Sequence, residues 1–242
     1  MTPTIANILG ERRVEGSLAE ERPIAIPHRD VHLTGSVAMV PRPNGVVLVA
    51  NDRGCSRHSP LTRRLTAELR RHGFTTVLVD LLLPAEVGNP AVAAWMRTQI
   101  DELARRIGSA RIWIAERPEL PALPVVLFGE GAGAAATLLS AAVRPAGVAA
   151  VIAHGERPDT VGITLQCVRA PALLLVDARS DHLSANLRAH GRLSGAKGIE
   201  LMPDGSTPED CARSAAGWLG AQLSGATRRT TKPVVAGTVP AV

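Results

Sequence analysis

Residues 124–139 constrain the fold of this chain more than any other stretch. They begin with a short, continuous apolar run, Val125–Phe128, of the kind that forms a parallel strand covered by helices on both faces. Glycines follow at Gly129, Gly131 and Gly133, and the residues after them are small or apolar and favour a helix. The chain is therefore expected to leave a central strand, turn sharply with little side-chain bulk, and enter a helix.

The remaining elements alternate in the same way. A strand-like alternation broken by a glycine predicts an antiparallel hairpin within residues 24–40. Buried strands are expected at 46–50, 75–80, 148–153 and 172–176, with a short last strand at 199–202. Helices are expected from Pro60, over 100–107, over 184–193, and from a Thr207 cap to about Leu223. This order predicts an α/β fold: a doubly wound, mostly parallel sheet of about eight strands, with helices on both faces and no large cap domain.

The chain divides into one domain and two terminal segments. Residues 23–223 contain every predicted element and are expected to form one domain, since no linker interrupts them. Residues 1–22 are mixed and charged, and we expect a flexible arm. Residues 224–242 form a tail with an apolar end, predicted to be disordered when free. Either segment could bind a partner protein or a second copy of the chain, for example as an added strand.

Charge and cysteine content exclude several classes of function. The formal net charge is +5, but the tail carries three positive charges and no acid, which leaves +2 for the rest. A nearly balanced domain is not expected to bind nucleic acid. The three cysteines are far apart and form no CxxC pair, so we expect no disulfide framework, no metal site and a reducing, cytoplasmic location. No stretch approaches about 18 consecutive apolar residues, so no membrane span is expected, and nothing in the sequence implies a cofactor.

The motifs at the ends of the predicted strands are similar to those of a known family. They are Arg57–Pro60, Asp80–Leu82, the glycine-rich turn around Gly131, Gly155–Asp159, and Arg169–Pro171 before the seventh strand. In this order the chain resembles the α/β-hydrolase superfamily, and within it the dienelactone-hydrolase-like proteins. The resemblance covers roughly residues 24–223.

The resemblance implies a catalytic triad, whose three positions are degenerate in this chain. The nucleophile would fall on Gly131, which has no side chain. The acid would fall on Ser180, with Asp181 next to it and Asp177 at the strand tip. The histidine would lie in the loop 203–206, which has none. We therefore predict a catalytically inactive protein that acts in binding or assembly, although the outer glycines are expected to leave room for a serine at position 131.

Two other uses of the strand tips remain open. In the first, a displaced site hydrolyses small esters or lactones, with Cys55 as nucleophile, His154 or His182 as base, and Asp181 orienting the histidine. In the second, the N–H groups of Ala132 and Gly133 open a helix and bind an anion, together with the charges of Arg53 and Arg57. Against the second use, the carboxylate of Glu130 or Asp52 could already occupy that helix end.

Overall fold

The computed structural model describes residues 20–52, 59–120, 123–155 and 157–230, with only the backbone described from 224 onwards. Eight strands form one sheet in the order β1-β2-β4-β3-β5-β6-β7-β8. Their bounds are β1 Arg22–His28, β2 Val31–Ala38, β3 Gly45–Asn51, β4 Phe74–Asp80, β5 Val125–Glu130, β6 Val148–His154, β7 Ala172–Asp177 and β8 Lys197–Met202. β1 and β2 pair as an antiparallel hairpin and β2 is antiparallel to β4, while all the other neighbours are parallel. The predicted sheet and its hairpin edge are confirmed.

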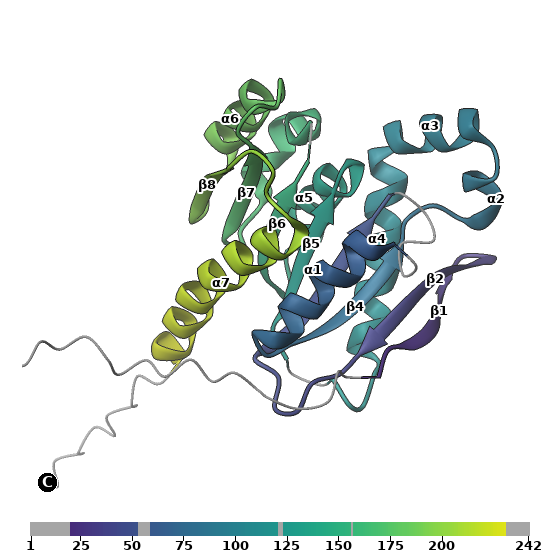
Figure 1. Ribbon diagram of the computed structural model, residues 1–242, viewed down its shortest axis with the longest axis horizontal. Helices are drawn as coiled ribbons and strands as arrows, with labels where there is room; N and C mark the ends of the chain where they lie inside the picture. Colours follow the sequence, from purple (N-terminus) through teal and green to yellow (C-terminus); the bar gives the residue numbers. More distant parts are fainter. Residues whose placement is uncertain (1–19, 53–58, 121–122, 156, 231–242) are drawn as a thin grey trace, which may run out of the picture.

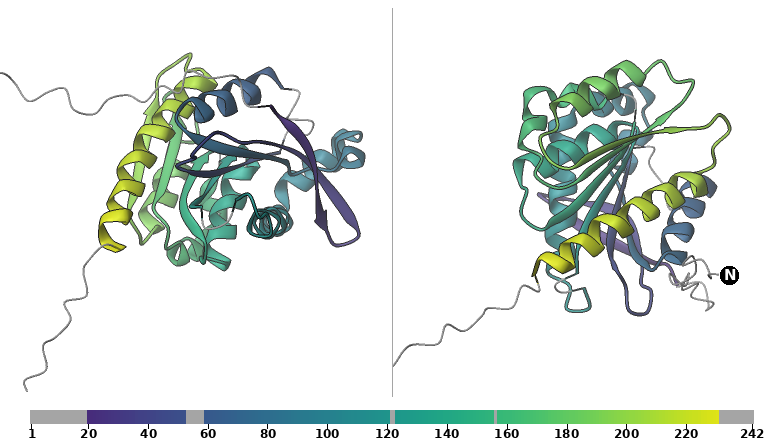
Figure 2. Two further views of the ribbon diagram at one scale, coloured as in Figure 1. Left: turned by 90° about the horizontal axis from the view of Figure 1, so that it is seen from below. Right: turned by 90° about the vertical axis from the view of Figure 1, so that its left-hand side faces the viewer.

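Helices cover both faces of the sheet (Figures 1 and 2). The helices are α1 Pro60–Arg71, α2 Pro84–Val87, α3 Pro90–Thr98, α4 Ile100–Ala115, α5 Ala132–Val143, the 3-10 helix η2 Pro158–Cys167, α6 Leu183–Arg192 and α7 Pro208–Thr230. One core lies beneath α1 and α7, where Leu65 and Leu219 pack against strand residues such as Phe128. The other core lies beneath α4 and α5 and includes Ile107 and Leu138. The strands read as continuous apolar runs because both of their faces are buried.

Four helices differ from the sequence-based expectations. α2 and α3 form a short helical excursion between β4 and α4, where no helix was expected, and it projects from the body at the top of Figure 1. η2 follows β6 where a loop was expected. α7 continues to Thr230 rather than ending near Leu223, so the first residues of the predicted tail are helical.

The other predictions about the terminal segments mostly fall outside the described residues. The predicted arm lies there except for its last residues, of which Arg22 begins β1. The tail beyond residue 230 lies there entirely. None of the helices in the described part of the chain has the length and apolarity needed to span a lipid bilayer.

A buried ionic network joins the α2 excursion to α4. Arg106, 5% exposed, donates from Nη1 and Nη2 to the two carboxylate oxygens of Glu86, both at 2.7 Å, and from Nη1 to the Leu81 carbonyl at 2.6 Å. Its Nε lies 3.4 Å from Glu102 Oε1, which is also 2.9 Å from His28 Nε2. Partial burial alone would raise the pKa of Glu102, but the bonds from His28 and Arg105 and the nearby arginine charges lower it to about 2.

This network generates a prediction about stability. Arg106→Leu leaves the Glu86 carboxylate without its bidentate partner, so we expect the free energy of unfolding to fall by roughly 3 kcal/mol. Arg105→Leu is the matched control, because the neighbouring Arg105 is 55% exposed and its ion pair is expected to contribute less than about 1 kcal/mol. Urea denaturation of both variants measures the difference. If both variants lost the same free energy of unfolding, Arg106 would not be what holds the α2 excursion against α4.

Stability should also depend on the charge of Glu102. The folded-state pKa of about 2 lies below the ordinary value of 4.5, so the ionised Glu102 stabilises the fold above pH 4.5, and this contribution disappears as the pH falls toward 2. Glu102→Gln should therefore lower the free energy of unfolding by about 1 to 2 kcal/mol at pH 7. The gap from the parent should shrink in denaturation curves measured at decreasing pH below 4.5. A gap that stays constant down to pH 3 would contradict this assignment.

Candidate functional site

The turn between β5 and α5 has the sharp geometry predicted for it. Gly131 has φ 59° and ψ −127°, a conformation that side chains rarely adopt. Its outer glycines are needed for close contact: a Cβ at Gly129 would lie 2.2 Å from the Gly133 carbonyl oxygen, and one at Gly133 would lie 2.5 Å from that of Ala50. The N–H of Gly131 donates to the His154 carbonyl at 3.1 Å, which joins the turn to the tip of β6. The turn therefore has the strained geometry of a nucleophile position, but its central residue, Gly131, has no side chain.

The carboxylate of Asp52 occupies the space in front of this turn. Asp52 follows β3, is 6% exposed, and accepts a hydrogen bond from the N–H of Ala132 at 3.0 Å. A Cβ on Gly131 would lie 2.8 Å and 3.0 Å from its two carboxylate oxygens. A serine at position 131 would therefore require the Asp52 side chain to shift, whereas the sequence-based expectation considered only the room left by the outer glycines.

Asp52 also occupies the N-terminal end of α5. A carboxylate at a helix N-terminus is stabilised by the partial positive charge of that end. Of the two sequence-based alternatives for Ala132, an external anion or an internal carboxylate, the structure shows the second. Glu130, the other candidate, instead accepts from Asn51 Nδ2 at 3.1 Å.

A cavity of about 530 Å³ opens beside Asp52. Arg97 from α3 lines it, with Nε 3.6 Å from Asp52 Oδ2, and so does Arg157 at the start of η2. The remaining lining residues are Thr98, Ile100, Gly131, Ala132, Ala135 and Thr160. This volume is typical of small-molecule sites, and its walls combine two guanidinium groups, two hydroxyl groups and one carboxylate.

A second, smaller hollow of about 300 Å³ lies at the tips of β6 and β7. His154 Nε2 lies 3.2 Å from Asp177 Oδ1 there, and His182 lines the same hollow. Asp181 is exposed and does not line it. The structure thus brings His154 and His182 to one hollow as predicted, and the carboxylate beside His154 is that of Asp177.

The predicted nucleophile and two predicted anion ligands, Cys55, Arg53 and Arg57, lie outside the described residues. Of the cysteines that the structure describes, Cys167 is exposed at the end of η2. Cys211 is buried on α7, and burial together with the charges of Asp177 and Glu130 raises its pKa to about 12. A thiol with this pKa stays protonated and is a poor nucleophile.

Sequence reasoning missed Arg97 and did not pair His154 with Asp177. Arg97 lies on a helix that the sequence did not predict, so no pattern pointed to it. The pair of His154 and Asp177 could have been predicted, because these residues end neighbouring parallel strands and lie at the same edge of the sheet. Within the described ranges, no group of three or more histidine, cysteine or carboxylate side chains is placed to hold a metal ion.

Comparison with known proteins gives several relatives and one negative result. No family model matches the chain. The structure is similar to that of a dienelactone hydrolase from Anabaena variabilis, with TM-score 0.76 and 28% identity over 86% of this chain and 99% of the other. It is also similar to a dienelactone hydrolase-like promiscuous phosphotriesterase from metagenomic libraries, with TM-score 0.67 and 14% identity over 85% of this chain and 99% of the other.

In sequence, the chain is 35% identical over 203 residues to a putative phosphoribosyl transferase of Mycobacterium tuberculosis, found in two strains. That match covers 81% of this chain and 45% of the relative, so the chain spans less than half the length of the curated relatives it matches. The eight-stranded sheet, the strained glycine turn and the structural likeness to dienelactone hydrolase lead to one conclusion. The chain has the α/β-hydrolase fold, and its structure is similar to that of dienelactone hydrolase.

Proposed function

We propose that this protein binds a small organic anion in the cavity beside Asp52 and does not hydrolyse it. The observation that carries the proposal is the hydrogen bond from the N–H of Ala132 to the Asp52 carboxylate. In an α/β-hydrolase the N–H of the residue after the nucleophile helps to stabilise the oxyanion of the transition state. Here that donor is already bonded to a negative charge from the protein itself.

Electrostatics and space both oppose acyl transfer at this position. A developing oxyanion near Ala132 would lie close to a buried carboxylate, and two like charges at short range in a partly buried site repel strongly. A nucleophilic side chain at position 131 would overlap the same carboxylate. The loop between β8 and α7 contains no histidine that could act as a general base there.

The same cavity is suited to binding. The guanidinium groups of Arg97 and Arg157 can each offer N–H donors to a carboxylate. The free lone pairs of Asp52 can accept a hydrogen bond from a hydroxyl group of the ligand. A small hydroxycarboxylate therefore matches the cavity in charge and hydrogen bonding. The name phosphoribosyl transferase describes the whole of the longer relatives, and this chain matches 45% of their length.

One observation favours a second candidate function. The hydrogen bond between His154 and Asp177 has the geometry of a histidine oriented by a carboxylate, which is the arrangement of a general base. A hydrolase with a displaced site would use this pair to activate a water molecule or the thiol of Cys55. Activity lost on His154→Gln would identify it.

The first prediction here concerns catalysis. Because Asp52 blocks the oxyanion position, the unmodified protein should hydrolyse p-nitrophenyl acetate no faster than bovine serum albumin at equal concentration. His154→Gln and Cys55→Ala should leave that background rate unchanged. Saturable turnover that disappears in either variant would refute the non-catalytic reading and establish the displaced hydrolase.

The second prediction concerns binding, with L-malate as the hydroxycarboxylate probe. Calorimetric titration should show one site per chain, and Arg97→Gln should weaken binding about tenfold, because a charge-assisted hydrogen bond is lost. Arg179→Gln is the matched control, since Arg179 is 84% exposed and does not line the cavity. Equal affinities for the parent and Arg97→Gln would contradict the proposed site.

The third prediction tests the steric role of Asp52. Gly131→Ala carries two costs, the strained backbone and the overlap with the carboxylate, and only the second is removed by Asp52→Ala. The two changes should therefore be coupled by about 1 kcal/mol in a double-mutant cycle of urea denaturation. Additive effects would show that the carboxylate moves aside freely. Gly131→Ser should also give no ester turnover.

A further inference from the structure

We propose that a groove between helices α4 and α5 binds a free monocarboxylate with a straight apolar tail, such as a medium-chain fatty acid. The groove is a cavity of about 360 Å³, which lies within the size range of small-molecule sites. Among the described residues, none lines both this groove and the cavity beside Asp52. The groove is therefore a separate site, and the inference does not rest on the proposed function.

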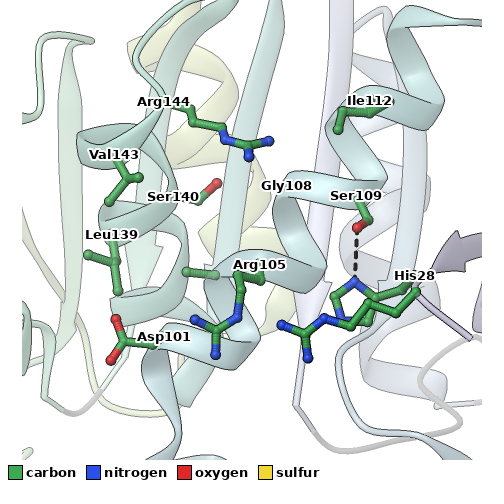
Figure 3. A pocket seen from close by; sticks show the side chains of 12 residues that line it. His28, Asp101, Arg105, Gly108, Ser109, Ile112, Leu139, Ser140, Val143 and Arg144 are labelled. Carbon is green, nitrogen blue, oxygen red and sulfur yellow. Dashed lines mark hydrogen bonds between the residues drawn. The ribbon is translucent and has the colours of Figure 1, made fainter. Parts of the chain in front are cut away.

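Figure 3 shows how the groove is built. Leu139 and Val143 project from α5 on one side, and Ile112 from α4 lies on the other. Arg105 and Asp101 lie toward one end and Arg144 toward the other, with Gly108 between them. Between the charged ends the walls thus carry the aliphatic side chains together with the hydroxyl groups of Ser109 and Ser140, so an occupant with an apolar body and a charged head can contact both kinds of surface.

Two arginines at one end form the head-group site. Arg105 Nε lies 2.9 Å and Arg29 Nη1 3.6 Å from the same oxygen of Glu102, while the two side chains are 55% and 60% exposed. Each guanidinium has five N–H donors, so the contact with Glu102 leaves most of them for a second anion. Glu102 is held from behind by His28 and Arg106, so both arginines are anchored before a ligand arrives.

Positive charge exceeds negative charge around the groove. Asp101 is the one carboxylate among its described lining residues, against the guanidinium groups of Arg29, Arg105 and Arg144. Arg111, which lines the adjoining hollow, donates to the carbonyls of Ser140 and Ala146. Burial and the nearby charge of Arg144 lower the pKa of Arg111, as expected where cations lie close together. The excess of positive charge around the groove favours an anionic ligand over a neutral one.

The backbone of α4 is open to close contact in the middle of the groove. Gly108 lies inside a helix of 16 residues, where glycine costs about 1 kcal/mol relative to alanine. A Cβ at this position would meet nothing within 4 Å in the described structure outside its own helix. Packing within the described chain therefore does not require a glycine here, and the missing side chain leaves the middle of the groove open to a ligand.

Arg29 carries a similar local cost. It has φ 52° in the two-residue turn between β1 and β2, a conformation that favours glycine or asparagine. The arginine places its guanidinium against Glu102 at the end of the groove, which neither of those residues could do. A strained residue that supplies a charged group to a cavity indicates a binding role.

The length of the groove sets the length of the tail. Arg105 and Ile112 are separated by seven residues of helix, or about 10 Å along its axis. A further hollow of about 410 Å³ continues past Gly108 and Ile112, lined by aliphatic residues that include Ile114 and Val125. A straight acyl chain of medium length fits this path, with its carboxylate between Arg29 and Arg105.

Decanoate, kept below its aggregation concentration, is the probe. Calorimetric titration into the full chain should give one site, with a dissociation constant on the order of 100 µM. Arg105→Gln and Arg29→Asn should each weaken binding about tenfold, through loss of a charge-assisted contact. Arg29→Asn should also leave the melting temperature unchanged or raise it, since asparagine suits the turn, and a purely structural role for Arg29 predicts the reverse. Arg192→Gln, an exposed arginine on α6, is the control.

Substitutions at Gly108 separate the groove from nonspecific binding. Gly108→Leu should abolish decanoate binding by filling the groove, while the helix remains as stable as before or gains stability. Gly108→Ala, which adds one methyl group, should keep most of the affinity and shows whether the helix tolerates a side chain.

Three results would overturn the proposal. The first is no detectable binding at decanoate concentrations up to about fivefold above the expected dissociation constant. The others are equal decanoate affinities for the parent and Gly108→Leu, or decan-1-ol binding as tightly as decanoate. Arg97→Gln should leave decanoate binding unchanged, and Arg105→Gln should leave L-malate binding unchanged. Failure of this site and failure of the proposed function are therefore distinguishable.

Discussion

The hydrogen bond between the Asp52 carboxylate and the N–H of Ala132 is the contact on which the arrangement of the candidate site depends. It connects the end of β3 to the first turn of α5 across the strained glycine of the turn. The positive end of α5 is satisfied by a charge from the same chain, which stabilises the turn and removes the donor that an oxyanion would need. One contact thus stabilises the turn and, in the function proposed above, takes up the donor that acyl transfer would need.

The sheet around this contact retains the arrangement in which α/β proteins bind ligands. The tips of β3, β5, β6 and β7 meet at one edge, where the end of β6 supplies His154, and α3 and the start of η2 supply Arg97 and Arg157. The rigid strands hold these groups in position whether or not chemistry follows. A binding function therefore needs only the cavity and its charges, whereas hydrolysis also needs a nucleophile, a base and a free oxyanion donor.

The parts of the fold that the sequence predicted are those governed by local patterns. The run Val125–Phe128 with its glycine turn, the β1–β2 hairpin and the start of α7 at Pro208 depend on apolar periodicity, glycine and proline chemistry within a few residues. The pair His154–Asp177 and the overlap of Asp52 with position 131 depend on strand register and on side chains that meet across 23 and 79 residues of chain. No local pattern encodes those distances. Arg97 was missed for a different reason, since the helix α3 was itself unexpected.

The two proposed sites use the same pair of chemical groups with opposite consequences. Beside α5, the carboxylate of Asp52 is bonded to the backbone and lines the cavity, so it acts both as the block and as one of the ligand contacts. Beside α4, the carboxylate of Glu102 lies behind Arg29 and Arg105, whose guanidinium groups face the solvent. A carboxylate in front of a backbone donor excludes an anion from that donor, whereas a carboxylate behind exposed arginines orients them toward one. In both proposed sites, the position of the carboxylate relative to the hydrogen-bond donors decides whether those donors can bind an external anion.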